Sequence, residues 1–331
     1  MKQHHHLVGI LCGLGAAAIW GGMYVVSKVV LDVIPPFSLV TLRLLLGIGV
    51  LWGVLAFQGG VGLTRRQWGQ ALAVGLVGYG VSLGFQFIGT RLSTASNGAL
   101  VTSATPAFVL LFAAWLLGER ITRPRLLALA LATLGVVAVI DPRTARLSPD
   151  LFWGNLSLVA AALTWALYSV LVRKATRGMK VLPATMVFFI GGLFITLPGA
   201  AIELQRITVG EITAGVVAGV LYLGVISTAL AMYLWNRAFT ELEAGVASLT
   251  FFAQPVVGAA LGALFLGEQL SLLFLVGGVL IGLGLWLGAF AYLINPRWMV
   301  WSQLPLPAWV RTIWRSGTCS APTCSICSPW G

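Results

Sequence analysis

The chain has 331 residues, of which 59% are hydrophobic and only 9% are charged. An average soluble protein carries roughly 25% charged residues, so this composition excludes a water-soluble fold, a disordered chain, a collagen and a disulfide scaffold. The net charge of +11 is spread between apolar runs, which indicates membrane topology and argues against nucleic-acid binding.

Ten apolar runs follow one another with short polar breaks, and most have the roughly 17 to 25 residues that cross a bilayer. The fifth run is short, but flanking arginines can reach both interfaces. The first run has signal-peptide-like alanines, yet it continues to Val30, and we interpret it as a retained span. The predicted spans are 7–29, 37–57, 68–89, 95–117, 126–140, 152–172, 183–202, 212–235, 244–266 and 271–293.

The basic residues are divided unequally between the two sides of these spans. Fourteen Lys and Arg residues lie on the side of the N-terminus and four on the other side. Because the more basic side is normally cytoplasmic, we expect both termini in the cytoplasm and the protein in the cytoplasmic membrane. Residues 1–6 then form a cytoplasmic N-terminus, and residues 294–331 form a cytoplasmic tail that is either disordered or interfacial. The three cysteines of the tail have no fourth ligand nearby, so no metal site is predicted.

The chain also contains an internal repeat with nearly constant offsets of 145 to 149 residues. Each copy holds five predicted spans, over residues 7–141 and 152–293. Because five is odd, the second copy enters the membrane from the opposite face. The sequence therefore predicts an all-α integral membrane protein with ten transmembrane helices in two inverted five-helix repeats. The paired positions are Trp20 with Trp165, Pro106 with Pro255, Gly118 with Gly267, and Glu119 with Glu268.

These motifs resemble the drug/metabolite transporter superfamily, in particular the EamA-type ten-span permeases. The resemblance covers about residues 7–293. It implies a ten-helix bundle, a central substrate cavity between the halves, alternating access and outward transport, and it leaves the substrate open. The residues that carry it are Trp20-Gly21-Gly22 with Lys28, Leu42-Arg43-Leu44, Thr105-Pro106 to Gly118-Glu119-Arg120, Trp165-Ala166-Leu167-Tyr168, and Gln254-Pro255 to Gly267-Glu268.

The sequence lacks the residues that several kinds of catalysis and cofactor binding need. The three histidines all precede the first span, which leaves no Ser-His or Cys-His catalytic pair and no embedded metal site. No lysine follows a glycine, so no phosphate-binding loop exists. We therefore predict neither enzymatic activity nor a cofactor. All nine carboxylates lie in connections or at span ends, which favours a facilitator or exchanger over an obligate proton antiporter.

Arg43 is the most informative single charge, because it lies inside the second span on the predicted external side. Lipid exposure there would cost about 2.5 kcal/mol or more. Lys28, Gln86 and Asn97 fall at the same depth and would complete a polar vestibule for a carboxylate-bearing substrate. The alternative is that Arg43 bonds backbone carbonyls and fixes helix packing.

Aromatic and amide residues near mid-depth are the other cavity candidates. Trp20 and Trp165 are related by the repeat and can present flat faces to a substrate, with Tyr24 and Tyr168 one turn away. Alternatively, each ring fills the bundle core. Prolines free backbone groups that are tolerated only beside protein or water, so the fourth and ninth spans are expected to border the cavity with Thr102 and Gln254.

Glu119 and Glu268 occupy corresponding Gly-Glu turns. We expect each carboxylate to cap the N-terminal amides of the helix that follows it. A gating role through an ion pair with a nearby arginine is the alternative.

The sequence thus predicts a secondary transporter, an exporter or facilitator of a small organic metabolite such as an amino acid or its analogue. Its partners would be this substrate and the lipid bilayer, and small-residue faces leave a homodimer open. Two alternatives remain: a non-transporting membrane scaffold, and a membrane enzyme that acts on lipid-linked substrates.

Overall fold

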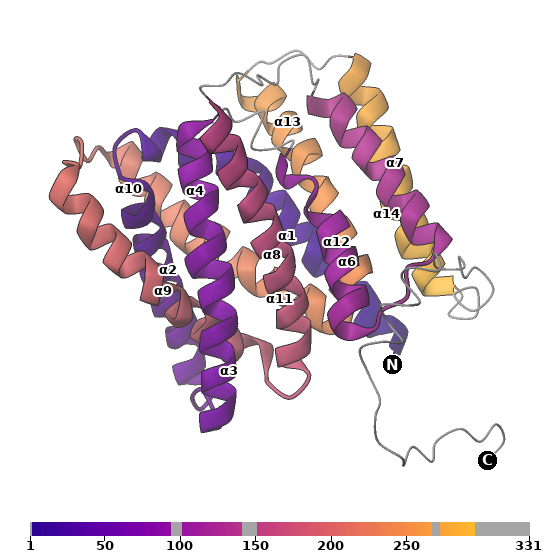
Figure 1. The fold of residues 1–331 in the computed structure, drawn as a ribbon, viewed down its shortest axis with the longest axis horizontal. Helices are drawn as coiled ribbons and strands as arrows, with labels where there is room; N and C mark the ends of the chain where they lie inside the picture. Colours follow the sequence, from indigo (N-terminus) through magenta and orange to yellow (C-terminus); the bar gives the residue numbers. More distant parts are fainter. Residues whose placement is uncertain (1, 94–100, 141–150, 267–271, 295–331) are drawn as a thin grey trace.

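A computed structural model describes residues 2–93, 101–140, 151–266 and 272–294, and for some of these, including Tyr24 and Lys28, the backbone alone. Every regular element in these ranges is a helix (Figure 1). The helices are α1 Lys2–Leu31, α2 Pro36–Phe57, α3 Arg65–Gly75, η1 Leu76–Ser82, α4 Leu83–Leu92, α6 Thr105–Leu117, α7 Arg123–Ile140, α8 Phe152–Thr176, α9 Val181–Arg206, α10 Ala214–Leu221, η4 Tyr222–Leu230, α11 Ala231–Glu241, α12 Ala244–Leu249, η5 Thr250–Phe252, α13 Ala253–Leu266 and α14 Leu272–Ile294.

Six helical stretches in the described ranges are long and apolar enough to cross a membrane, whereas the sequence predicted ten spans. Three shorter apolar helices accompany them, at Thr105–Leu117, Ala244–Gly258 and Leu275–Gly288. The six long stretches are His5–Met23, Pro36–Phe57, Arg65–Leu92, Phe152–Thr176, Val181–Arg206 and Ala214–Glu241.

The helix ends follow local sequence chemistry. Pro36 occupies the first turn of α2, where its missing N–H costs nothing. Thr64 and Gln67 form a capping box at the start of α3, each side chain accepting from the other's backbone N–H. Gly118 ends α6 with φ of 68°, a left-handed conformation that glycine adopts without strain.

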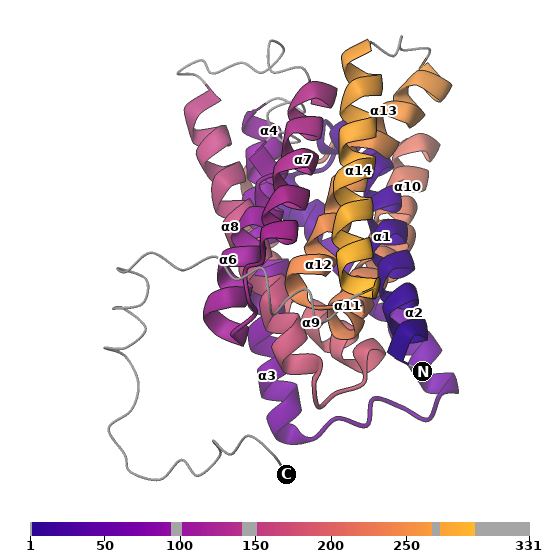
Figure 2. The same ribbon diagram turned by 90° about the vertical axis from the view of Figure 1, so that its right-hand side faces the viewer.

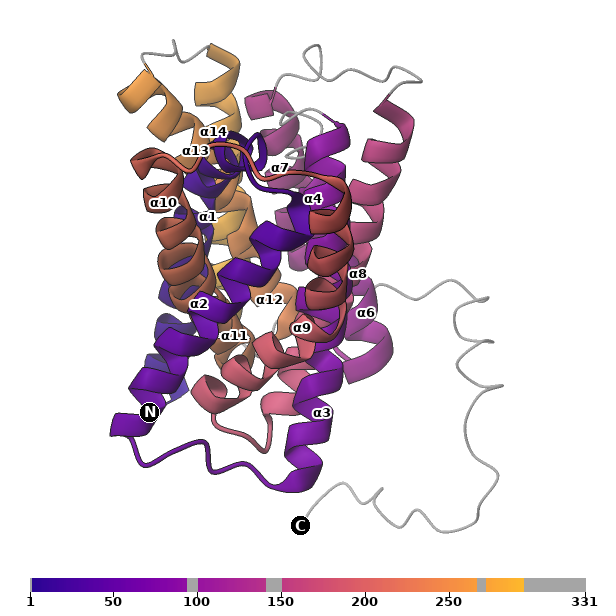
Figure 3. The ribbon, with the colours of Figure 1, turned by 90° about the vertical axis from the view of Figure 1, so that its left-hand side faces the viewer.

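The chain passes back and forth between two ends of one bundle. One end, which we call the N-terminal end, carries the start of α1 and the segments 58–64, 118–122, 177–180 and 242–243 (Figure 1). Segment 58–64 runs along this end from α2 to α3 (Figure 3). Glu119 therefore lies at the N-terminal end.

Helices from before residue 141 pack mainly on helices from after residue 151. α1 packs against α11 and α13, α2 against α9, and α4 against α8. α7 and α14 lie side by side along one edge of the bundle (Figure 2). The two halves of the sequence are thus interleaved.

Glycine permits the closest of these approaches. A Cβ added to Gly21 of α1 would lie 2.9 Å from the backbone nitrogen of Gly258 in α13. In α3, a Cβ on Gly75 would lie 1.9 Å from the carbonyl oxygen of Phe188 in α9. Small residues let helix backbones meet, as in other helical membrane bundles.

Both prolines lie where the helical path is interrupted. Pro106 lies in the first turn of α6, which begins at Thr105 after a turn at residues 103–104. In the ninth predicted span, the 3-10 segment η5 separates α12 from α13, just before Pro255. Two π-helical segments, η1 and η4, interrupt the third and eighth predicted spans. Such irregular segments frequently mark functional sites.

Candidate functional site

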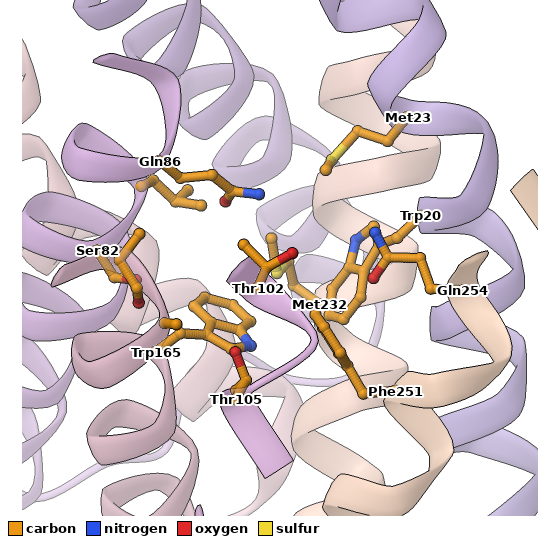
Figure 4. A pocket seen from close by; sticks show the side chains of 13 residues that line it. Trp20, Met23, Ser82, Gln86, Thr102, Thr105, Trp165, Met232, Phe251 and Gln254 are labelled. Atoms are coloured by element: carbon orange, nitrogen blue, oxygen red, sulfur yellow. The ribbon is translucent and has the colours of Figure 1, made fainter. Parts of the chain in front are cut away.

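A cavity lies at the centre of the bundle, where the interrupted helices meet. Figure 4 shows Trp20 and Gln254 on one side, with Ser82, Gln86 and Trp165 on the other. Seven lining residues precede residue 141 and six follow residue 151, so both halves of the chain build it. The lining comprises Trp20, Met23, Ser82, Leu83, Gln86, Thr102, Thr105, Ala161, Ala162, Trp165, Met232, Phe251 and Gln254.

Aromatic rings form the floor of this cavity. The rings of Trp20 and Trp165 meet edge to face, with centroids 5.9 Å apart. Trp235 packs against both, at 5.3 Å from Trp20 and 6.4 Å from Trp165. Trp20 is fixed further, because its Nε1 donates to the carbonyl oxygen of Ser227 in the π segment η4 at 3.0 Å. Trp20 therefore both lines the cavity and belongs to the packed core, the two alternatives that the sequence left open for it.

Two buried polar atoms of the lining have no hydrogen-bond partner. They are Nε1 of Trp165, which can only donate, and Oε1 of Gln254, which can only accept. Trp165 is 8% exposed and Gln254 6%. Leaving buried polar groups unpaired is costly, so the cavity is suited to a ligand that offers one acceptor and one donor. No charged residue belongs to the described lining.

The volume of the cavity is about 30 Å³. That is room for water, whereas a dry cavity that admits benzene has roughly 150 Å³. The structure therefore represents a conformation in which the centre of the bundle is closed around its own side chains.

A larger groove of about 520 Å³ lies between α2, α4 and α9, at the end of the bundle opposite the N-terminus. Its charged lining consists of Arg91 and Glu203, and Glu203 already accepts hydrogen bonds from the backbone and the hydroxyl of Ser38. This groove is open and has few polar groups, so the central cavity is the better candidate site.

The residues expected at the site from the sequence are placed in three ways. Trp20, Gln86, Thr102, Trp165 and Gln254 line the cavity. Asn97 and Glu268 lie outside the described residues, and for Tyr24 and Lys28 the side chains are not described. Arg43 and Tyr168 are fully buried beside the cavity and are not part of its lining.

Tyr168 belongs to a buried hydrogen-bond network and not to the cavity wall. Its hydroxyl donates to Oδ1 of Asn236 at 2.6 Å and lies 2.6 Å from the hydroxyl of Tyr79. The amide nitrogen of Asn236 donates in turn to Thr185 at 3.0 Å. Because Tyr168 lies one turn after Trp165 on α8, its ring contacts Trp165 while its hydroxyl points to the neighbouring helices. The network joins α8, α9, α11 and η1.

Arg43 is 1% exposed and does not lie in an open vestibule as the sequence suggested. Its Nε donates to Thr228 Oγ1 at 3.0 Å, and its Nη2 donates to Ser227 Oγ at 3.4 Å and to Met23 Sδ at 3.6 Å. Its Nη1 has no partner. The π segment η4 thus supplies both hydroxyls that hold the guanidinium.

Glu119 forms the centre of an ion-pair cluster at the N-terminal end. Its carboxylate accepts from the backbone N–H groups of Ala244 and Gly245, at 2.8 and 3.1 Å. Its Oε1 lies 3.1 Å from Nε of Arg173, and its Oε2 lies 4.0 Å from Arg125, which also pairs with Glu243. The expectation that Glu119 caps the next helix is wrong. It caps α12, from the other half of the chain, and ties the two halves together.

Sequence reasoning did not identify several lining residues. For some, helix periodicity carried a signal: Met23 follows Trp20 by three residues, and Ala161 and Ala162 precede Trp165 by four and three. Phe251 has the same spacing, three residues before Gln254, whereas Met232 gave no such signal. The sequence also did not identify Arg173 as a partner of Glu119, because the charge of Arg173 was assigned to membrane topology.

Several long apolar helices around an internal cavity define a multi-pass helical membrane protein. The chain belongs to the EamA-like transporter family, whose profile matches residues 7–140 and again residues 152–290.

Its relatives include named transporters. A Salmonella typhimurium protein named a probable amino-acid metabolite efflux pump is 28% identical over 295 residues, which cover 84% of this chain and 93% of that protein. A Pseudomonas aeruginosa protein named a probable biotin transporter is 29% identical over 232 residues, 68% of this chain and 79% of that protein. One crystal structure matches 85% of this chain and 96% of its own with a TM-score of 0.72, and at 22% identity it shows the likeness of fold.

Proposed function

We propose that this protein is a secondary transporter of a small organic metabolite, and that it works by alternating access through the central cavity. The observation that carries the proposal is that both halves of the chain line one cavity, seven residues from the first and six from the second. Motion of one half against the other then opens the cavity to one side or the other.

The inverted repeat gives this motion its symmetry. The repeat predicts Glu119 at one end of the bundle and Glu268 at the other, in ten spans with both termini in the cytoplasm. The position of Glu119 beside the N-terminal end supports this arrangement. Its ion pair with Arg173 and its hydrogen bonds to Ala244 and Gly245 then close the cytoplasmic side. Opening that side requires these contacts to separate.

An amino acid or its analogue suits the cavity chemically. An oxygen atom of the substrate can accept from Nε1 of Trp165, an ammonium can donate to Oε1 of Gln254, and an apolar side chain can lie against Trp20 and Phe251. The name of the Salmonella typhimurium relative, an amino-acid metabolite efflux pump, agrees with this class and with outward transport. We propose facilitated or exchange transport, because no carboxylate belongs to the described lining.

The test is transport of a mixed metabolite pool by the purified protein in liposomes, read by mass spectrometry. Gln254→Leu removes the unpaired acceptor from the cavity, and Gln70→Leu makes the same change at an exposed position of α3. We expect wild type and Gln70→Leu to move one compound class alike. We expect Gln254→Leu to move it about tenfold more slowly below saturation, the effect of losing ~1.4 kcal/mol of binding.

Two outcomes contradict the proposal. Wild-type liposomes that move no compound under any gradient would favour a non-transporting scaffold. Equal rates for all three proteins would place the transport path elsewhere than the central cavity.

A further inference from the structure

Arg43 is a buried cation without a counter-ion among the residues that the structure describes. It lies seven residues into α2, about 10 Å from the helix start, and it is 1% exposed. Its hydrogen-bond partners are two hydroxyls and one thioether, and the ring of Phe87 lies 5.1 Å from its Cζ. None of the ion pairs formed by described residues includes it.

The other two largely buried arginines of the described bundle have carboxylate counter-ions. Arg125 pairs with Glu119 and Glu243, and Arg173 pairs with Glu119. Buried charges are normally compensated in this way, because an unpaired charge in a medium of low dielectric constant is expensive. Arg43 is the exception in the described chain.

Part of the guanidinium lacks a close hydrogen-bond partner, and one of its contacts is a residue of the cavity lining. Nε is fixed by Thr228 at 3.0 Å, whereas Nη2 makes only the long contacts to Ser227 and Met23, and Nη1 makes none. Met23 also lines the cavity, so a single side chain touches both the guanidinium and the cavity space. Methionine is unbranched and flexible, which makes it the side chain that most easily moves aside.

We propose that Arg43 is the binding residue for an anionic group of the substrate, a carboxylate that pairs with Nη1 and Nη2 once Met23 rotates away. This inference rests on the proposed function, since it assigns one part of the transported molecule to one residue. The terminal nitrogens of arginine form the two-pronged arrangement that carboxylates accept best. The apolar remainder of the substrate lies among the aromatic rings of the cavity.

The first test uses benzoate and benzamide, which have nearly the same shape and differ in charge. Binding is measured by the rise in melting temperature of the full-length protein in detergent, for wild type, Arg43→Gln and Arg43→Lys. In wild type we expect benzoate to bind at least tenfold more tightly than benzamide. Arg43→Gln should remove this preference and leave benzamide binding within about twofold, while Arg43→Lys should retain part of it because the charge remains.

A second measurement separates a binding role from a structural one. Arg43→Met replaces the charge with an apolar side chain of similar length. Thr228 still donates its hydroxyl to the carbonyl of Leu223 at 2.7 Å, so it loses only an acceptor role. We expect the melting temperature without ligand to stay the same or rise, because the uncompensated charge is gone, and the benzoate response to disappear. An arginine that merely holds α2 to η4 would give a lower melting temperature instead.

The outcomes distinguish this inference from the proposed function. If the wild type binds benzoate more tightly than benzamide but transports nothing, the anion site stands and the proposed transport function is overturned. If the wild type transports but binds benzoate no more tightly than benzamide, the anion site is overturned and the transporter stands. The same follows if Arg43→Gln weakens the binding of benzoate and benzamide equally.

Discussion

The hydroxyl oxygens of Tyr79 and Tyr168 lie 2.6 Å apart at a point where neither side chain reaches solvent. Because the single hydroxyl proton of Tyr168 goes to Asn236, the Tyr79 hydroxyl donates to Tyr168. The two rings also meet edge to face, with centroids 5.0 Å apart. One pair of side chains thus joins η1 to α8 through both a ring contact and a hydrogen bond, and both rings contact Trp165 of the cavity lining.

Tyr168→Phe should destabilise the protein by about 1–3 kcal/mol, since it leaves the buried Oδ1 of Asn236 without a donor. Tyr222→Phe is the matched control. Its hydroxyl is partly buried and donates to the carbonyl oxygen of Ile19, so a smaller loss is expected. Unfolding midpoints in detergent measure both. Equal midpoints for the two variants would contradict the assignment of the network as a stabilising element.

Trp165→Phe and Trp235→Phe should separate binding from stability. Both substitutions remove ring volume from a packed position, so the two variants are compared with each other. The Nε1 of Trp165 has no partner, so Trp165→Phe should cost stability only through lost ring contacts and should raise the KM for the transported substrate. The Nε1 of Trp235 donates to Ser169 at 3.1 Å in a fully buried position, so Trp235→Phe should cost about 1 kcal/mol more stability than Trp165→Phe. The prediction fails if both variants lose stability alike.

Glu119→Gln should weaken the closure of the N-terminal end. It removes the charge that compensates Arg173 and Arg125, at a cost of ~3 kcal/mol for a largely buried pair. Glu241→Gln, at the same end, weakens an i,i+4 pair with Arg237, whose side chain is 35% exposed, and a contact with the exposed His5, and should cost less than about 1 kcal/mol.

The readout is maleimide labelling of Met232→Cys, a cavity position, in a chain whose four native cysteines are replaced by serine. We expect labelling to accelerate severalfold in Glu119→Gln and to remain at the parent rate in Glu241→Gln. A parent rate in both variants would show that these contacts do not limit access to the cavity.

Gly75→Ala and Gly69→Ala test the backbone contact between α3 and α9. The new Cβ at residue 75 would overlap the carbonyl oxygen of Phe188, so the helices must separate at a cost of about 1–3 kcal/mol or more. At Gly69 a Cβ meets nothing within 4 Å, and alanine should stabilise the helix by ~1 kcal/mol. Opposite changes in the unfolding midpoint are expected, and equal changes would contradict the close approach.

The sequence predicted the helices better than their interruptions. The length of an apolar run determines whether it can cross a bilayer, so Pro36–Phe57 and Phe152–Thr176 begin within a residue of the predicted spans at 37 and 152. The start of α6 at Thr105 and the 3-10 segment η5 were not predicted, since both lie within sequence runs that were assigned to single spans. The division into two inverted units of five spans stays a prediction.

At the site, the depth of a residue within the bundle was easier to predict than the neighbours that its side chain contacts. Trp20, Trp165 and Gln254 were placed at mid-depth from their positions within the spans, and all three line the cavity. Arg43 was placed at the correct end of α2 but in the wrong surroundings, because a count along a helix does not reveal which neighbours enclose it. Ala244, whose backbone N–H donates to Glu119, is 125 residues away, and no local pattern indicates such a contact.

A ligand of amino-acid size does not enter a cavity of about 30 Å³ without rearrangement. Any dissociation constant measured on the resting protein therefore includes the free energy of opening, and the apparent affinity falls in proportion to the open fraction. Weak binders in an equilibrium screen can thus be efficient cargo. A substitution that raises the open population will raise the apparent affinity for every true substrate by the same factor, without adding a single contact.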